Sequence, residues 1–243
     1  MILSNQHIKY LRALQLKKNR QKYGQFLVEG EKSVMELFTS SFVVERLYGL
    51  RGYVLDEVIQ TDVELVYASQ TELSRITHLK TAPPLMALVN IPEAKMPKIP
   101  DDQWTIVLDR INDPGNLGTI IRIADWFGIQ NVVCSTDTVD LYNHKSLMAT
   151  MGSFGRVEVS YCDIAELLSN SGQAKYFALL DGQDIKSLKK PNPGLIVIGS
   201  EAHGISSELM EIEHTAITIS GSGGAESLNA GVSAGIICHS LID

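Results

Sequence analysis

The stretch TIVLDRINDPGNLGTIIRIAD, residues 105–125, carries the signal that decides the fold class. Its first five residues are apolar or β-branched up to the final Asp, which is typical of a buried strand. The Asp-Pro-Gly sequence at 113–115 supplies turn chemistry, and apolar residues such as Ile120 and Ala124 then recur with a helical period. We expect Asn116 to cap this helix with its side-chain oxygen. The stretch therefore predicts a strand–turn–helix unit.

Similar apolar runs follow along the rest of the chain, with helical patterns between several of them. They are NVVCS (131–135), RVEVS (156–160), YFALL (176–180), LIVIG (195–199) and TAITIS (215–220). Short continuous apolar strands that alternate with helices favour a mainly parallel sheet covered on both faces. The fold class is thus α/β for residues 104–243. In such sheets ligands bind at the carboxyl ends of the strands.

The N-terminal part reads as a separate, mixed α/β domain. Three prolines and few large apolar residues between positions 91 and 103 indicate an extended connection. We therefore place a domain at 1–95, a linker at 96–103 and a second domain at 104–243. In the first domain we expect helices at 7–18 and 30–39 and strands at 42–48, 64–67 and 85–89, and we find no catalytic pattern or metal cluster.

Two further loops follow strands of the C-terminal domain. In one, Gly199 and Ser200 precede Glu201, a carboxylate that is costly to bury without a partner. In the other, a glycine-rich loop leads into a helix expected to start near Glu226, with small residues at 227, 231 and 235. Neither the dinucleotide GxGxxG pattern nor a P-loop is present. Since all these loops end strands of one sheet, they predict a single pocket.

At these residues the sequence resembles the SpoU (TrmH-like) family of the SPOUT RNA 2′-O-methyltransferase superfamily. DPGNLGTIIRIAD, IGSEAHGIS and ESLNAGVSAGI are similar to the three ordered motifs of that family, and the resemblance covers residues 104–243. Residues 1–95, which include FLVEGEKSVMELF, resemble the small RNA substrate-binding domain related to ribosomal protein L30e. Departures from the usual motifs occur at Arg110, Ile111, Thr119, Ile123 and Ala230-Gly231.

The resemblance implies a deep trefoil knot and a homodimer with active sites near the subunit interface. It also implies methyl transfer from S-adenosylmethionine to a ribose 2′-hydroxyl, and rRNA is the expected substrate. It implies no metal. The catalytic positions it matches are Asn116, Arg122, Glu201, Ser227 and Asn229, and the positions expected to bind the cofactor are Leu180, Gly199, Ser200, Ile219 and Leu228.

A mechanistic hypothesis follows for these residues. Arg122 would contact the target oxygen or its adjacent phosphate, and Asn116 and Glu201 would orient Arg122. Ser227 and Asn229 would position the donor and the ribose. Because arginine stays charged in proteins, we expect electrostatic stabilisation of the developing alkoxide rather than general-base catalysis.

Charge is unevenly distributed along the chain. The net charge is −7, yet residues 1–95 hold 12 basic and 10 acidic residues, whereas the remainder holds 9 and 18. The first 24 residues contain no acid, and their basic side chains are candidates for contact with RNA phosphate, although a solvated helix face explains the same pattern. These candidates are Lys9, Arg12, Lys17, Lys18, Arg20 and Lys22.

Other features of the sequence are compatible with a cytoplasmic enzyme. Three separated cysteines fit free thiols in a reducing compartment, and we find neither a secretory signal nor an apolar stretch long enough to span a membrane. Three alternatives stay open. The chain could be a tRNA-directed enzyme or a base methyltransferase of the same superfamily, or a non-catalytic RNA-binding or ribosome-assembly protein. A Rossmann dehydrogenase is the least supported, because its fingerprint is missing.

Overall fold

The computed structural model describes residues 3–54, 62–189 and 191–242. The chain divides into two compact units. The first comprises residues 1–93 together with 142–155, and the second comprises residues 94–141 and 156–243. The boundary near residue 93 lies close to the linker expected at 96–103. The sequence analysis placed all of 104–243 in one domain, however, whereas residues 142–155 belong to the first unit.

The first unit is built on a four-stranded sheet in the order β1-β4-β2-β3. Strands β2 and β3 are parallel, while β4 runs antiparallel to both β1 and β2. Its elements along the first 93 residues are α1 (Asn5–Ala13), α2 (Lys17–Tyr23), β1 (Gln25–Glu29), α3 (Glu31–Leu37), β2 (Val44–Leu50), β3 (Leu65–Ala68), α4 (Gln70–Ser74) and β4 (Leu85–Asn90).

The start of the chain differs from the single helix expected at 7–18. Helix α1 ends at Ala13, and a second helix, α2, begins at Lys17. The buried guanidinium of Arg20 holds the connection, since its Nη1 donates to the carbonyls of Leu14 and Gln15, each at 2.9 Å. Helical periodicity continues across this turn, so periodicity alone could not reveal the break.

Residues 142–155 connect two strands of the second unit but pack in the first. They form α6 (His144–Thr150) and a 3₁₀ turn, η1 (Ser153–Gly155). The rings of Phe26 and Tyr142 lie 4.4 Å apart, and those of Phe42 and Phe154 lie 5.6 Å apart. Strand β1, which the sequence analysis did not predict, therefore contributes a buried aromatic residue to this contact.

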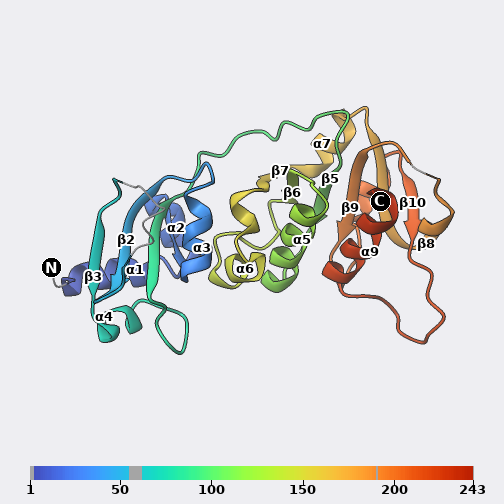
Figure 1. Cartoon of the computed structure of the whole chain (residues 1–243). Helices are drawn as coiled ribbons and strands as arrows, with labels where there is room; N and C mark the ends of the chain where they lie inside the picture. Colours follow the sequence, from blue (N-terminus) through green and yellow to red (C-terminus); the bar gives the residue numbers. More distant parts are fainter. Residues whose placement is uncertain (1–2, 55–61, 190, 243) are drawn as a thin grey trace. The chain divides into compact units, whose positions relative to one another are not determined.

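The second unit contains six parallel strands in the order β10-β8-β9-β5-β6-β7 (Figure 1). The predicted α/β class with a mainly parallel sheet is confirmed. The strands are β5 (Thr105–Asp109), β6 (Asn131–Ser135), β7 (Glu158–Cys162), β8 (Ala174–Asp184), β9 (Gly194–Gly199) and β10 (Thr215–Thr218). The helices are α5 (Pro114–Trp126), α7 (Ile164–Asn170), α8 (Ser207–Met210) and α9 (Ala230–Ile242), with a 3₁₀ turn, η2 (Ile185–Ser187).

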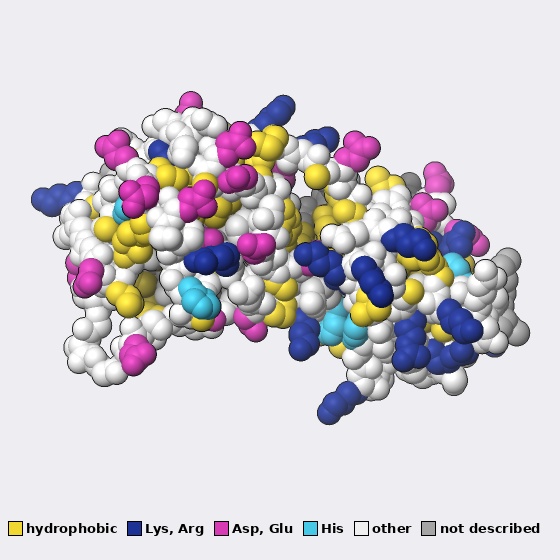
Figure 2. Space-filling view, turned by 180° about the vertical axis from the view of Figure 1, so that it is seen from behind, with side chains coloured by type: hydrophobic (Ala, Val, Ile, Leu, Met, Phe, Trp, Pro, Cys, Tyr) yellow, Lys and Arg dark blue, Asp and Glu magenta, His cyan; other side chains and the backbone are white. Residues whose placement is uncertain are grey.

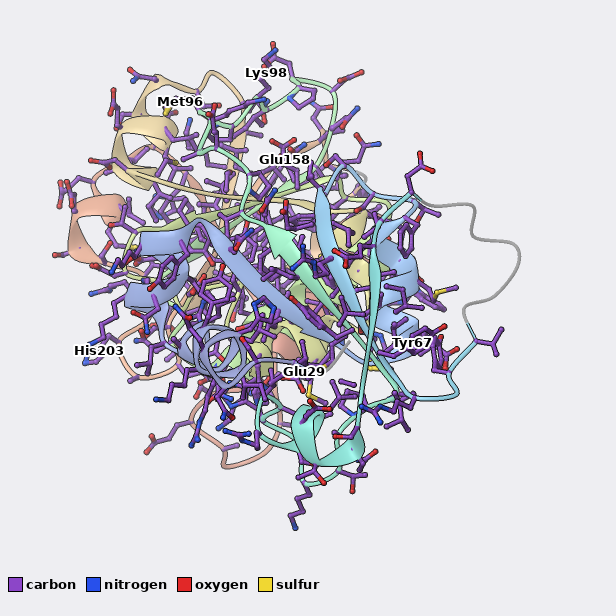
Figure 3. The ribbon with its side chains drawn as sticks, turned by 90° about the vertical axis from the view of Figure 1, so that its left-hand side faces the viewer. Glu29, Tyr67, Met96, Lys98, Glu158 and His203 are labelled. Atoms are coloured by element: carbon purple, nitrogen blue, oxygen red, sulfur yellow. The ribbon has the colours of Figure 1, made fainter. Side chains whose placement is uncertain are left out.

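One apolar core lies against the sheet under α7 and α8. Val107 of β5 and Val197 of β9 share it with Leu168 and Leu209 from these helices. Helices α5 and α9 pack against each other (Figure 1). Residues 94–104, ahead of β5, contain no helix or strand, and the exposed Met96 and Lys98 are labelled on this segment in Figure 3.

Candidate active site

Helix α5, which carries the first motif, begins at Pro114 and therefore earlier than a cap at Asn116 would place it. Asp113 is the N-cap of α5 and accepts a hydrogen bond from the backbone N of Asn116 at 2.8 Å, while Pro114 occupies the first helical position. The prediction that Asn116 caps the helix is therefore wrong. Aspartate followed by proline is a recognisable start signal for a helix, so the sequence did contain the correct cap.

Because Asp113 caps the helix, the Asn116 side chain is available for contacts with the other two motifs. Its Nδ2 donates to Oε1 of Glu201 at 2.6 Å, and its Oδ1 accepts from Nδ2 of Asn229 at 2.8 Å. Asn229 Nδ2 also donates to Glu201 Oε1 at 2.9 Å. Asn116, Glu201 and Asn229, here called the polar triangle, thus bond pairwise from segments far apart in the chain.

Helix α9 starts directly from this triangle. It begins at Ala230 rather than near Glu226 as expected. Asn229 Oδ1 accepts from the backbone N of Gly231 at 3.0 Å and of Val232 at 3.3 Å, and Glu201 Oε1 accepts from Ala230 N at 3.1 Å. Two motif side chains therefore satisfy the free N–H groups of the first helical turn. The negative charge of Glu201 also lies at the favourable end of the helix dipole.

The packing of α9 on α5 explains the departures at 119, 123 and 231. A Cβ atom on Gly231 would lie 3.0 Å from Cγ2 of Thr119, and one on Gly235 would lie 3.6 Å from Cδ1 of Ile123. The larger residues on α5 thus face glycines on α9. Of the expected small-residue stripe, residue 227 lies outside the helix, whereas 231 and 235 form the contact.

The segment that follows β9 folds back closely on the end of that strand. Gly199, the last residue of β9, leaves no room for a side chain, because a Cβ atom there would lie 2.2 Å from the carbonyl carbon of Gly204. Ser200 is buried, its carbonyl accepts from Gly204 N at 2.7 Å, and its Oγ accepts from His203 N at 3.3 Å. The side chain of His203 is exposed, as Figure 3 also shows.

Strand β8 contains an irregularity where the sequence predicted a cofactor contact. Its pairing with β10 jumps from Phe177 to Gln183, so the residues between them leave the ladder. Leu180 lies in this bulge with its side chain 75% exposed, and its carbonyl accepts from Thr218 Oγ1 at 2.9 Å. Bulges of this kind are common beside active sites, where they redirect side chains.

The segment after β10 is open. Ile219 is half-buried, and every residue from 221 to 229 is exposed, including the apolar Leu228. A hydrogen bond from Ser220 is the main cause that lowers the pKa of Asp184, which ties the start of this segment to the end of β8. Of the positions expected to bind the cofactor, Gly199 and Ser200 are therefore enclosed within the turn at 199–204, while Leu180 and Leu228 are exposed.

Two of the expected catalytic residues lie outside the polar triangle. Ser227 is exposed in the open segment. Arg122 is exposed, and its guanidinium contacts no partner among the residues that the structure describes. It lies six positions after Asn116 on α5, which turns its side chain about 120° away around the helix axis. Within the described chain, Asn116 and Glu201 therefore orient Asn229 and the start of α9, and they do not hold Arg122.

Sequence reasoning missed Asp109, the residue that ends β5. It is 3% exposed, and its Oδ2 accepts from the backbone N of Ser206 at 2.7 Å. This contact closes the far end of the segment that starts at Ser200. A carboxylate that terminates a run of buried apolar residues was the available signal, because such a group requires a partner.

The basic residues of the first unit separate into two kinds. Arg20 is 5% exposed and is occupied by backbone carbonyls, so its role is structural. The other five, Lys9, Arg12, Lys17, Lys18 and Lys22, are exposed on α1 and α2. Figure 2 shows Lys and Arg side chains gathered on the visible face of this unit.

The described part of the chain lacks both a cluster of metal-ligating side chains and a helix that could span a membrane. No group of three or more His, Cys, Asp or Glu side chains is arranged there to bind a metal ion. Likewise, none of the helices in the described ranges combines the length and apolar character needed to cross a membrane.

Comparison with known families agrees with this geometry. The model of the SpoU rRNA Methylase family matches residues 103–239. The model of the MRM3-like substrate binding domain matches residues 5–87. The two matches correspond to the parallel-sheet region with the polar triangle and to the sheet region with the exposed basic helices.

Individual relatives match over nearly the whole chain. The sequence is 30% identical to the 23S rRNA (guanosine(2553)-2′-O)-methyltransferase RlmP of Bacillus subtilis, over 98% of this chain and 96% of that protein. The structure superposes on a TrmH-family protein of Porphyromonas gingivalis with a TM-score of 0.90 and 34% identity, covering 99% and 98% of the two chains. The AdoMet complex of the SpoU methyltransferase AviRb from Streptomyces viridochromogenes shares the fold, with a TM-score of 0.86, 22% identity and coverage of 98% and 97%.

Proposed function

The chain belongs to the SpoU rRNA methylase family, and from this premise we propose that it transfers the methyl group of S-adenosylmethionine to a ribose 2′-hydroxyl of ribosomal RNA. The observation that carries the proposal is the polar triangle. Hydrogen bonds between Asn116, Glu201 and Asn229 join the three motif segments at one end of the sheet. These three side chains come from segments far apart in the chain and meet at one point, so a single site can use them together.

The residues at the strand ends fit S-adenosylmethionine. Leu180, Gly199 and Ile219 follow or lie near the carboxyl ends of the adjacent strands β8, β9 and β10, where ligands of parallel sheets bind. The exposed side chains of Leu180 and Leu228 offer apolar surface for an adenine ring, and Ser200 and Gly199 contribute backbone groups. The bound cofactor supplies an electrophilic methyl group on a sulfonium, so activation by a metal is unnecessary.

Residues of the chain then have to align the ribose and manage charge on its 2′-oxygen. We assign the polar triangle to alignment, because its members are fixed by one another and by the first turn of α9. Ser227 and Asn229 lie in the exposed segment that leads into that helix, and we assign them to positioning the ribose. Arg122 stabilises the negative charge that develops on the oxygen, since a guanidinium remains protonated throughout.

The free position of Arg122 supports a homodimer. Trp126, one helical turn further along α5, is 84% exposed, and Val232 on α9 is 51% exposed. Large exposed apolar residues at such positions favour contact with another protein surface. We propose that this face packs against a second copy of the chain and that Arg122 acts at the subunit interface. A trefoil knot in residues 104–243 and a cytoplasmic location also remain proposals from the family resemblance.

The exposed basic residues of α1 and α2 are proposed to contact RNA phosphates. Five cations without an acid in the same segment attract a polyanion through counterion release, which makes binding dependent on salt. Arg20 is excluded from this set because it is buried. The first unit, residues 1–93 with 142–155, would then serve as the substrate-binding domain.

The central test is methyl transfer from labelled S-adenosylmethionine to ribosomal RNA, followed by nuclease digestion and mass spectrometry of the modified nucleotide. A methylated ribose in ribosomal RNA is the expected product. Methylation of a base, or of transfer RNA alone, would overturn the assignment. Binding of the cofactor without any transfer to RNA would favour a non-catalytic protein.

The RNA-contact surface needs a test that preserves the fold. Deleting residues 1–95 would also strip the packing partners of Tyr142 and Phe154, so truncation would confuse stability with binding. The substitutions Lys17→Glu and Lys18→Glu avoid this problem. We expect the pair to weaken RNA binding while cofactor affinity stays unchanged, whereas Glu211→Lys in the second unit serves as a charge control. Equal loss of both affinities would contradict the proposal.

A further inference from the structure

Arg110 stands immediately after β5 in an unusual backbone conformation. Its φ is 56°, and Met151 is the other non-glycine residue with positive φ in the described ranges. This left-handed region is uncommon for residues with a side chain, and such positions cluster at functional sites. Glycine would adopt it without steric cost, so the backbone alone gives no reason for an arginine here.

Neighbouring groups hold both the backbone and the side chain of Arg110. Its backbone N donates to Oγ of Ser135 at 2.9 Å, and Ser135 Oγ lies 3.0 Å from Oγ1 of Thr138. Its Nε donates to Oδ1 of Asp109 at 3.2 Å. The Asp109 side chain is only 4% exposed, whereas that of Arg110 is 35% exposed. A buried carboxylate therefore fixes the inner part of the guanidinium.

The outer part of the same guanidinium remains available. Its two Nη atoms contact no partner among the described residues, although they are the atoms that form paired bonds with phosphate oxygens. Asp109 is paired with Gly199 in the sheet, and Gly199 precedes the segment that carries Glu201. Arg110 is thus placed at the carboxyl end of the central strand, next to the strand end proposed for the cofactor.

We propose that Arg110 forms a phosphate-binding site for the phosphodiester beside the methylated ribose. The inference rests on the proposed function and adds a substrate contact to it. In RNA the carbon that bears the 2′-hydroxyl is bonded to the carbon that bears the 3′-phosphate, so a reactive 2′-oxygen always brings a phosphate anion to the same strand end. Asp109 orients the guanidinium, and Arg110 anchors the backbone of the substrate.

The test uses the full-length protein and an rRNA fragment that the wild-type enzyme methylates. Arg110→Met keeps the backbone strain but removes the charge, and Arg110→Gly removes both. Arg156→Met is the matched control, because Arg156 also pairs with an aspartate, Asp125, but precedes the amino end of β7. The readouts are KM for RNA, kcat, affinity for S-adenosylmethionine, thermal unfolding and the salt dependence of RNA binding.

We expect both Arg110 variants to raise KM for RNA by about tenfold, as for the loss of one charge-assisted contact. The slope of log affinity against log salt should decrease by about 0.7 to 1, and kcat and cofactor affinity should change less than about twofold. Arg110→Gly should unfold at a temperature no lower than Arg110→Met does. Arg156→Met should leave KM and the salt slope unchanged.

Different results separate the possible failures. Unchanged KM and salt slope in both Arg110 variants would overturn the phosphate site, as would a loss of activity that follows the unfolding temperature and is rescued by cooling. If the wild-type protein transferred no methyl group, the proposed reaction would fail instead, and RNA binding by fluorescence anisotropy would still test the Arg110 contact. A reduced salt slope in that assay supports the site, and an unchanged slope overturns it.

Discussion

Asn116 and Glu201 are separated by 85 positions in sequence, yet their side chains are joined by a hydrogen bond of 2.6 Å. The same carboxylate oxygen also accepts from Asn229 Nδ2 and from the backbone N of Ala230. One atom therefore holds the start of α5, the segment after β9 and the start of α9 together. Such a contact links the stability of the second unit to the geometry of the proposed active site.

Substitution of Glu201 should affect both properties. Glu201→Ala removes the acceptor of three donors, and because Asn116 is buried, we expect the free energy of unfolding to fall by about 1–3 kcal/mol. Glu201→Gln retains an oxygen acceptor and should preserve most of the stability. Methyl transfer should decrease roughly tenfold or more in Glu201→Ala, as positioning is lost. Urea denaturation and turnover measure the two effects, and wild-type stability of Glu201→Ala would contradict this view.

Substitution of Arg122, unlike that of Glu201, should lower activity without lowering stability. Its guanidinium makes no contact within the described part of the chain, so Arg122→Ala should unfold at the wild-type temperature. Loss of a group that stabilises developing negative charge typically lowers turnover about 10²- to 10³-fold. Single-turnover methylation, together with calorimetric binding of S-adenosylmethionine, would separate chemistry from cofactor affinity. Near-wild-type turnover in the folded variant would end the assignment.

The α5–α9 contact offers a pair of substitutions with opposite expected signs. Gly231→Ala places a Cβ 3.0 Å from Thr119 Cγ2, and overpacking of this kind costs about 1–3 kcal/mol. Gly235→Ala meets Ile123 at 3.6 Å, an ordinary contact, so its higher helix propensity should stabilise the protein by about 0.5–1 kcal/mol. Thermal unfolding of the two variants and of Gly231→Ala with Thr119→Ala tests this. If the double variant were no more stable than Gly231→Ala, Thr119 would not be the cause.

Local sequence patterns predicted the architecture of the second unit because its strands are buried on both faces. A run such as LIVIG at 195–199 is continuously apolar because both faces of the strand are covered, and the structure places β9 at these residues. The ends of elements were harder to predict. Asp113 and Asn116 both have capping side chains, and the choice between them depends on Glu201, which is close only after folding.

Longer-range features could not be read from local patterns at all. Residues 142–155 join the core of the first unit although they lie between two strands of the second. Strand β1 contains Phe26 and Val28 in alternation, but five residues give too short a period to distinguish it from a loop. The separation of Arg122 from the polar triangle within the chain follows from helix geometry, because six positions along a helix turn a side chain about 120° around the axis; membership of the same motif does not imply contact.

The first unit contains a contact whose stability should depend on pH. The rings of His78 and His144 lie 4.2 Å apart. Burial is the main cause that lowers the pKa of His144 from 6.5 to about 4, with further contributions from His78, Lys145 and Arg20. Between pH 6.5 and 4 the unfolded chain therefore binds more protons at this residue than the native state. The contribution of His144 to stability is accordingly lost as the pH falls through that window.

We expect His144→Gln to lose less stability than the wild type when the pH is lowered from 7 to 5. Glu29 titrates in the opposite sense, since burial raises its pKa, but it is common to both proteins and cancels in the comparison. His203→Gln, which removes an exposed imidazole from the second unit, is the matched control for the loss of one histidine. Urea denaturation at several pH values provides the measurement. Parallel stability curves for wild type and His144→Gln would show that the His78–His144 contact does not titrate as its burial requires.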